Sequence, residues 1–124
     1  MKRKIEIVLE HLPDARLNPN RLRSEHWTAR HRATQEAKAE IGWLAKAQWH
    51  NDEPMMIVRI SYEFHVKDKR RRDLDNLIGA CKAYVDGLID VGVLFYDDAR
   101  HLEIGGARLV EDDTDKTILR IQEL

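Results

Sequence analysis

The chain has a single cysteine among its 124 residues, Cys81, so it can form neither an internal disulfide nor a zinc site built from several cysteines. Aromatic residues make up only 6% of the sequence, which leaves the core to aliphatic side chains. The net charge is −1, from 21 basic and 22 acidic residues, and this balance excludes a uniformly basic nucleic-acid binder. Affinity for nucleic acid would therefore require cations gathered on one face.

Long hydrophobic runs are also missing. The longest, residues 91–96, is interrupted by Gly92 and is far too short to span a bilayer. The first residues turn at once into the alternating pattern KIEIVLE at positions 4–10, which is typical of a strand and unlike a signal peptide. The hydrophobic fraction of 43% is that of an ordinary folded domain. We expect a soluble cytoplasmic protein with a single domain over residues 1–124.

Hydrophobic periodicity predicts the order strand, helix, strand, helix, strand, strand, which is typical of an α+β domain with a small mixed β-sheet and two main helices. Even-numbered residues from 56 to 66 are expected to face the core. The last two strands, joined by the acidic turn 111–115, are expected to form a hairpin. The predicted elements are a strand at 4–10, a helix from 24 to about 49 capped by Ser24, a strand at 55–66, a helix at 74–90 capped by Asp73, a strand at 101–110 with a bulge at Gly105-Gly106, and a strand at 116–124.

Charge is concentrated at residues 67–76, which read KDKRRRDLDN. The five cations among residues 67–72 attract phosphate, while Asp73 and Asp75, one residue apart, attract a hard divalent metal. Few functions need both at one place, and metal-dependent cleavage of nucleic acid is one of them. The residues alone leave an alternative open, in which the cations form a solvated loop and the aspartates are a helix cap and a solvated acid.

Two further charged side chains follow. Asp98 comes directly after the apolar residues 93–96, and this anchor lets it approach Asp73 and Asp75 from the side. Lys82 lies two helical turns behind Asp75, roughly 10 Å along the axis, where its ammonium can stabilise a leaving oxygen. A weak ion pair between Lys82 and Asp86 is the alternative. No glycine-rich phosphate loop is found, so no nucleotide cofactor is expected.

At these residues the chain resembles the RusA family of Holliday-junction resolvases, best known from phages and prophages. The resemblance rests on four segments and a weaker echo: RDLDNL at 72–77, KAYVDGL at 82–88, GVL at 92–94, DDA at 97–99, and the echo NPNR at 18–21. It implies a RusA-like homodimer and an endodeoxyribonuclease that depends on Mg²⁺, for which Mn²⁺ can substitute. Such an enzyme cuts four-way DNA junctions in paired strands during recombination and repair, in the cytoplasm of a bacterial or phage-infected cell.

The resemblance also implies roles for particular residues. It makes Asp73, Asp75 and Asp98 the catalytic, metal-binding acids, and it makes Lys82 the catalytic lysine. If the alignment is instead fixed at the aspartates, Gly79 takes the position of the catalytic lysine, and no lysine fills that role. Two rival functions stay open: a non-catalytic phage protein that binds branched DNA, and a nuclease for flaps or forks. The residues predicted to contact DNA are Lys67, Lys69, Arg70, Arg71, Arg72, Asn20 and Arg21.

Overall fold

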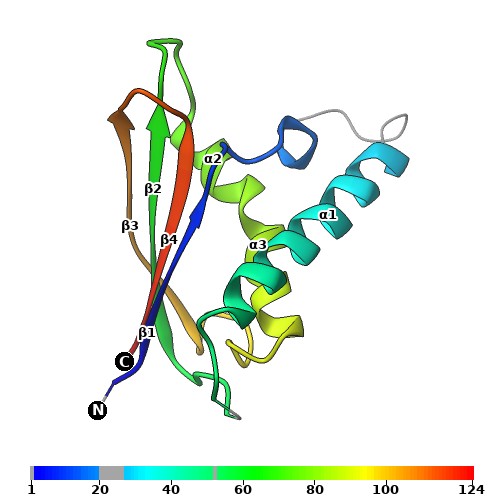
Figure 1. Ribbon diagram of the computed structural model, residues 1–124, viewed down its shortest axis with the longest axis vertical. Coiled ribbons are helices and arrows are strands. Elements are labelled where there is room, and N and C mark those ends of the chain that lie inside the picture. Colours follow the sequence, from blue (N-terminus) through cyan, green and yellow to red (C-terminus); the bar gives the residue numbers. More distant parts are fainter. Residues whose placement is uncertain (1, 20–26, 52) are drawn as a thin grey trace.

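The predicted α+β architecture with a small mixed sheet is confirmed by a computed structural model, which describes residues 2–19, 27–51 and 53–124. Figure 1 shows the four strands as one twisted layer, with the helices gathered against one of its faces. Within the described ranges, no helix is both long enough and apolar enough to cross a membrane. The elements are β1 (Lys4–Leu9), the 3-10 turn η1 (Ala15–Leu17), α1 (Trp27–Lys46), β2 (Val58–Val66), α2 (Leu74–Ala80), α3 (Lys82–Asp90), β3 (Leu102–Glu111) and β4 (Lys116–Glu123).

The strand order in the sheet is β1-β4-β2-β3, so the predicted C-terminal hairpin is wrong. β4 is antiparallel to both β1 and β2, whereas β3 runs parallel to β2 on the other side. The connection between β3 and β4 crosses the end of β2 instead of making a tight turn. There the amide of Asp112 donates to the carbonyl of Val66 at 2.9 Å, and the carboxylate of Asp115 accepts from the amide of Lys67 at 3.0 Å.

The burial of the two last strands follows from this order. β4 buries Ile118, Leu119 and Ile121, with exposed fractions of 8%, 0% and 1%. None of the ten residues of β3 is fully buried. A strand between two neighbours is shielded from water on both sides, whereas an edge strand leaves one side open. The inner place of β4 therefore accounts for its burial, and the place of β3 at the rim accounts for its exposure.

Strand β2 faces the helices as its alternation predicts. Val58, Ile60 and Phe64 are at most 1% exposed. Met56, expected to share this face, precedes the strand and is exposed, so that part of the prediction is wrong. The difference arises because the strand begins only at Val58, and the alternation of a strand does not extend into the loop before it.

The predicted bulge lies where β3 runs beside β2. Ile60 is paired with Ile104, and the next residue, Ser61, is paired with Gly106. Gly105 is the extra residue on the β3 side. A Cβ at Gly105 would lie 2.6 Å from the Arg59 side chain, so only glycine fits the bulge without a shift of that side chain.

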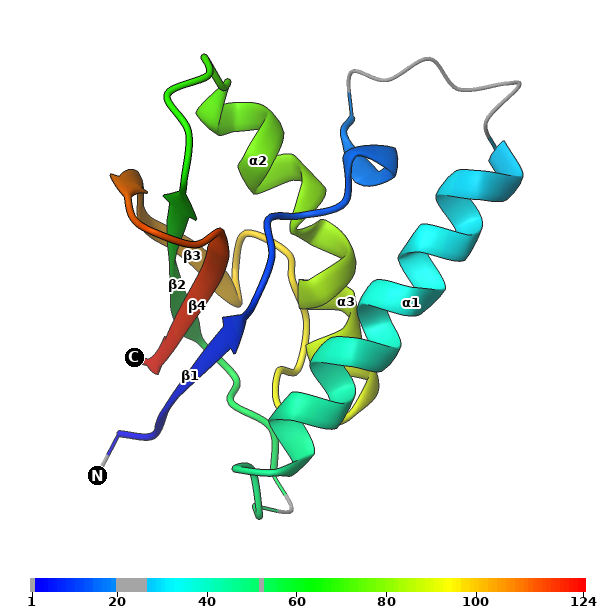
Figure 2. The ribbon, with the colours of Figure 1, turned by 45° about the horizontal axis from the view of Figure 1, so that its top comes forward.

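The predicted helix at 74–90 is divided at Cys81 into α2 and α3, although Cys81 keeps a helical conformation (φ −80°, ψ −4°). Figure 2 shows α1 lying along α3. A Cβ at Gly87 would lie 2.5 Å from Ile41 Cγ2 and 3.0 Å from Lys38 Cα, so the missing side chain permits this close approach. Ser24, the expected cap of the long helix, lies outside the described residues.

Candidate functional site

Asp73 and Asp75 lie together at the start of α2. Asp73 has an extended backbone (φ −95°, ψ 117°), and its Oδ1 accepts a hydrogen bond from the amide of Asp75 at 3.0 Å. This is the helix cap that the sequence predicts. Both aspartates are exposed, so their carboxylates are accessible to a metal ion from solvent.

A hollow of about 340 Å³ opens beside this helix start. It brings three arginines of the basic run next to Asp73, in agreement with the juxtaposition expected from the sequence. Asp14, Asn18 and Asn76 also line it and were not predicted as site residues. Asn76 lies within the RDLDNL segment, but nothing in the sequence marks Asp14. The lining consists of Leu12, Pro13, Asp14, Ala15, Asn18, Arg70, Arg71, Arg72, Asp73, Asn76, Leu77 and Ala80.

The cations of the basic run divide into two kinds. The guanidinium of Arg72 forms a two-pronged pair with Asp68, at 2.9 and 3.2 Å, and its side chain is only 9% exposed. This pairing lowers the pKa of Asp68 to about 2. Arg72 therefore shapes the loop. Lys67, Lys69, Arg70 and Arg71 are exposed, so a ligand can reach them.

Lys82 is held by two carboxylates. Its Nζ lies 2.7 Å from Asp97 Oδ2 and 3.3 Å from Asp86 Oδ1. The hydrogen bond to Asp97 is the main cause that raises the pKa of Lys82, and it lowers the pKa of Asp97 in turn. The pair with Asp86 is the alternative role that the sequence suggests for this lysine. Asp97 was missed, and its only signal in the sequence is its place beside Asp98.

Gly79, the alternative position for a catalytic lysine, is packed against the segment that follows the first strand. A Cβ there would lie 2.7 Å from Pro19 Cγ. The position thus serves close packing between α2 and Pro19. The other two residues of interest in that segment, Asn20 and Arg21, lie outside the described residues.

Asp98 lies in the turn before β3 and is directed to its own neighbours. Its Oδ1 accepts from the amide of Arg100 at 2.9 Å and lies 2.7 Å from His101 Nδ1, an interaction that lowers the pKa of Asp98. Across residues 2–19, 27–51 and 53–124, no three His, Cys, Asp or Glu side chains are grouped to hold a metal ion. The structure therefore joins Asp73 to Asp75 but does not gather Asp98 with them into one group.

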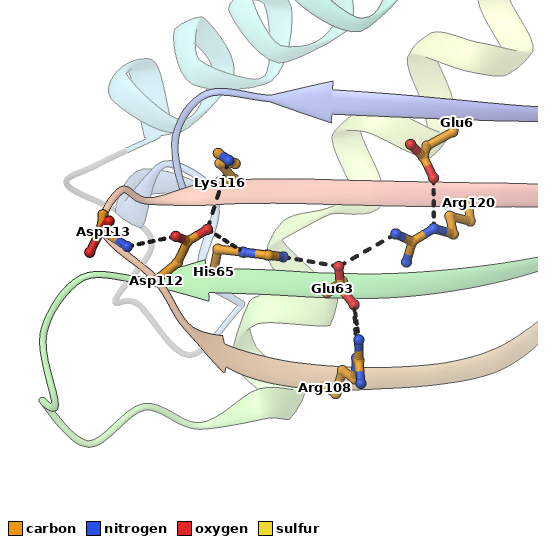
Figure 3. A network of polar contacts seen from close by, with 8 residues as sticks. All are labelled: Glu6, Glu63, His65, Arg108, Asp112, Asp113, Lys116 and Arg120. Atoms are coloured by element: carbon orange, nitrogen blue, oxygen red, sulfur yellow. Dashed lines mark hydrogen bonds and ion pairs between the residues drawn. The ribbon is translucent and has the colours of Figure 1, made fainter.

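A second charged cluster lies on the face of the sheet away from the helices, as Figure 3 shows. Glu63 is only 5% exposed, although strand alternation predicts a solvent-facing residue. Its carboxylate contacts His65 at 2.9 Å, Arg108 at 2.6 Å and Arg120 at 3.5 Å. The hydrogen bond from His65 contributes most to lowering the pKa of Glu63 to about 2. His65 Nδ1 in turn lies 2.7 Å from Asp112, so the imidazole bridges two carboxylates.

A scan against protein-family models found no match to the chain, and a search of curated proteins found none either.

Proposed function

We propose that this protein is a metal-dependent endodeoxyribonuclease of the RusA type, which resolves four-way DNA junctions by paired cleavage. The observation that carries the proposal is the hollow in which Arg70, Arg71 and Asp73 meet. Cations and a carboxylate side by side suit a phosphodiester. The cations bind its phosphate, and the carboxylate can hold a divalent metal beside it. The exposed Lys67 and Lys69 extend this basic surface along the DNA backbone.

The donor set at the start of α2 fits Mg²⁺, for which Mn²⁺ can substitute. Magnesium is commonly held by one or two carboxylates, with waters and substrate phosphate oxygens completing its shell. Asp73 and Asp75 supply two exposed carboxylates at one helix start. When bound, the metal polarises the phosphate and lowers the pKa of a coordinated water. Asp98 is the third ligand that the family resemblance implies.

The remaining roles fall to residues of the chain that bind and position DNA. Lys82 stabilises negative charge that develops on the phosphate, and its 68% exposed side chain can exchange Asp97 for the substrate. Arg72 keeps the basic loop in shape through Asp68. A two-fold dimer would present two such sites, as paired cleavage of a junction requires. Recognition then depends on branched shape more than on base edges.

A second candidate function is binding of branched DNA without cleavage. One observation favours it. Asp98 is hydrogen-bonded to His101 and is not grouped with Asp73 and Asp75 into a metal-binding cluster. A protein that uses only the exposed cations of the basic loop needs no such grouping. A nuclease that prefers flaps or forks over four-way junctions is the third possibility.

One experiment separates these functions. Synthetic four-way, three-way and linear duplex DNA of matched sequence are incubated with the protein in Mg²⁺, and binding is measured in parallel in Ca²⁺. The proposal predicts paired nicks in the four-way junction and little cutting of linear DNA. Junction binding with no cleavage in Mg²⁺ or Mn²⁺ would support the binding protein, and preferential cutting of three-way DNA would support the flap or fork nuclease.

A further inference from the structure

The start of α1 presents a pair of stacked aromatic rings to solvent. The indole of Trp27, the first residue of the helix, lies over the imidazole of His31, with 5.5 Å between the ring centroids and an angle of 6° between the ring planes. The two residues are one helical turn apart and so share a face of the helix. The indole is nevertheless 67% exposed, so a further flat ring can reach the stack.

Two arginines lie beside this stack, at a place where a helix disfavours cations. Arg30 and Arg32 are both exposed, and the first acidic residue of α1 is Glu36. The start of a helix carries the positive end of its dipole, which repels cations and attracts anions. The two arginines therefore do not help the helix to form. A local choice that opposes the local structure indicates a role in binding, here of an anion.

The stack lies at the same end of the molecule as the basic hollow. Figures 1 and 2 both show the starts of α1 and α2 at this end, with η1 between them. Arg30 Nη1 donates to the backbone carbonyl of Asn18 at 3.1 Å, and Asn18 lines the hollow that contains Arg70 and Arg71. A DNA strand with its phosphates in the hollow can therefore bring a neighbouring base to the stack.

The second exposed tryptophan of α1 lacks these features. Trp43, near the other end of the helix, is 79% exposed, and among the described residues no ring is stacked on it. Single exposed apolar side chains are ordinary on protein surfaces, so exposure alone identifies no binding residue. The stacked imidazole, the arginines and the link to the hollow distinguish Trp27 from Trp43.

From these observations we infer that Trp27 and His31 form a stacking platform for an unpaired nucleobase of branched DNA. Aromatic side chains stack on any base, because every base has a flat face, while Arg30 and Arg32 attract the phosphates of the same strand. Bases inside a duplex are already stacked on their neighbours, so the platform favours DNA in which a base at the branch point is unpaired. The inference rests on the proposed function for its ligand, and it adds a contact to the face of a base.

Binding of single-stranded DNA in EDTA tests the platform without any cleavage. The probes are an oligothymidylate and an abasic oligonucleotide of the same length, which offers the same phosphates without bases. The full chain should bind the oligothymidylate about tenfold more tightly than the abasic probe. Trp27→Ala should remove most of this difference, and Trp27→Phe should keep most of it, because phenylalanine also stacks. Trp43→Ala is the matched control and should bind both probes as the wild type does.

Tryptophan fluorescence provides a second measurement on the same samples. A base stacked on an indole quenches its emission, and the chain has three tryptophans. Oligothymidylate should quench the wild type and Trp43→Phe. It should quench Trp27→Phe only weakly, although this variant still binds the probe. This loss of quenching without loss of binding places the base on residue 27.

Equal binding of the two probes by the wild type would overturn the inference, as would a Trp27→Ala variant that binds like Trp43→Ala. These measurements contain no divalent metal, so their failure is distinct from failure of the nuclease proposal. A chain that stacks bases on Trp27 but never cuts DNA would contradict the nuclease and keep the platform. A chain that cuts four-way junctions and binds both probes equally would keep the nuclease and contradict the platform.

Discussion

Lys82 and Asp97 form an ion pair of 2.7 Å between Nζ and Oδ2, across the segment that joins α3 to the turn before β3. The pair links the lysine expected to act on the phosphate with the residue directly before Asp98. An exposed pair of this kind contributes little to stability, because water screens both charges. In the proposed function, the pair would hold the ammonium near the turn that carries Asp98.

Replacement of Lys82 by glutamine should lower cleavage of a four-way junction by about a hundredfold, the cost of losing one charge stabiliser in the transition state. Junction binding in Ca²⁺ should change little. The matched control is Lys38→Gln, which breaks a comparable surface pair between Lys38 and Asp90 at 3.3 Å. Equal activity of the Lys82 and Lys38 variants would show that Lys82 only forms ion pairs and takes no part in cleavage.

The exposed arginines of the basic run should set the salt dependence of DNA binding. We expect Arg70→Gln with Arg71→Gln to weaken binding to all DNA sequences alike and to reduce the slope of log K against log salt by about two, one per lost phosphate contact. Titrations at several salt concentrations measure this slope. Lys46→Gln, an exposed cation at the end of α1, should leave it unchanged. An unchanged slope in the double variant would mean that DNA binds to a different surface of the protein.

The cluster around His65 should make stability depend on pH. Glu63 and Asp112 raise the pKa of His65 above its usual 6.5, so its contribution is fully present below about pH 6.5 and is lost as pH rises through the raised value. The pKa of Glu63 is lowered from 4.5 to about 2, so its contribution is present above pH 4.5 and is lost as pH falls toward 2. The cluster therefore stabilises the fold most between these limits.

His65→Gln should accordingly lower the melting temperature more at about pH 5.5 than at about pH 9, because only the protonated imidazole pairs with both carboxylates. Thermal unfolding across this range measures the difference. His50→Gln, which replaces an exposed histidine, is the control and should show no such trend. An effect of His65→Gln that is the same at every pH would contradict a charged imidazole in the cluster.

The contact between α1 and α3 should tolerate no side chain at Gly87. Alanine there meets Ile41 and the backbone of Lys38, so we expect a loss of about 1–3 kcal/mol in the free energy of unfolding. Gly42→Ala is the graded control, since its Cβ would meet only Val91 Cγ1, at 3.1 Å, and that side chain can move. Urea denaturation should rank Gly87→Ala as the less stable of the two.

Local patterns predicted the parts of the fold that depend on neighbours in sequence. The alternation of β2, the cap at Asp73 and the bulge at Gly105 all follow from side-chain type and period. The hairpin prediction failed because strand order depends on packing across the whole sheet and not on which strands follow one another in the chain. β3 has more apolar residues than β4 and still lies at the rim, so no count of apolar residues in the two strands could have given the order.

The candidate site shows the same division. The meeting of the basic run with Asp73 could be predicted, because these residues are adjacent in the chain. The contributions of Asp14 and Asn18 to the hollow, and of Asp97 to the Lys82 pair, depend on tertiary packing, which no local pattern encodes. The burial of Glu63 likewise depends on Arg108 and Arg120 from two neighbouring strands.

Asp75→Asn tests most directly whether Asp73 and Asp75 serve metal-dependent cleavage of branched DNA. The substitution keeps the size of the side chain and the amide that Asp73 caps, so the fold should be retained. We expect the variant to bind a four-way junction in Ca²⁺ as the wild type does. In Mg²⁺ it should show no detectable cleavage of the junction. Wild-type rates of Mg²⁺-dependent cutting by Asp75→Asn would contradict the account.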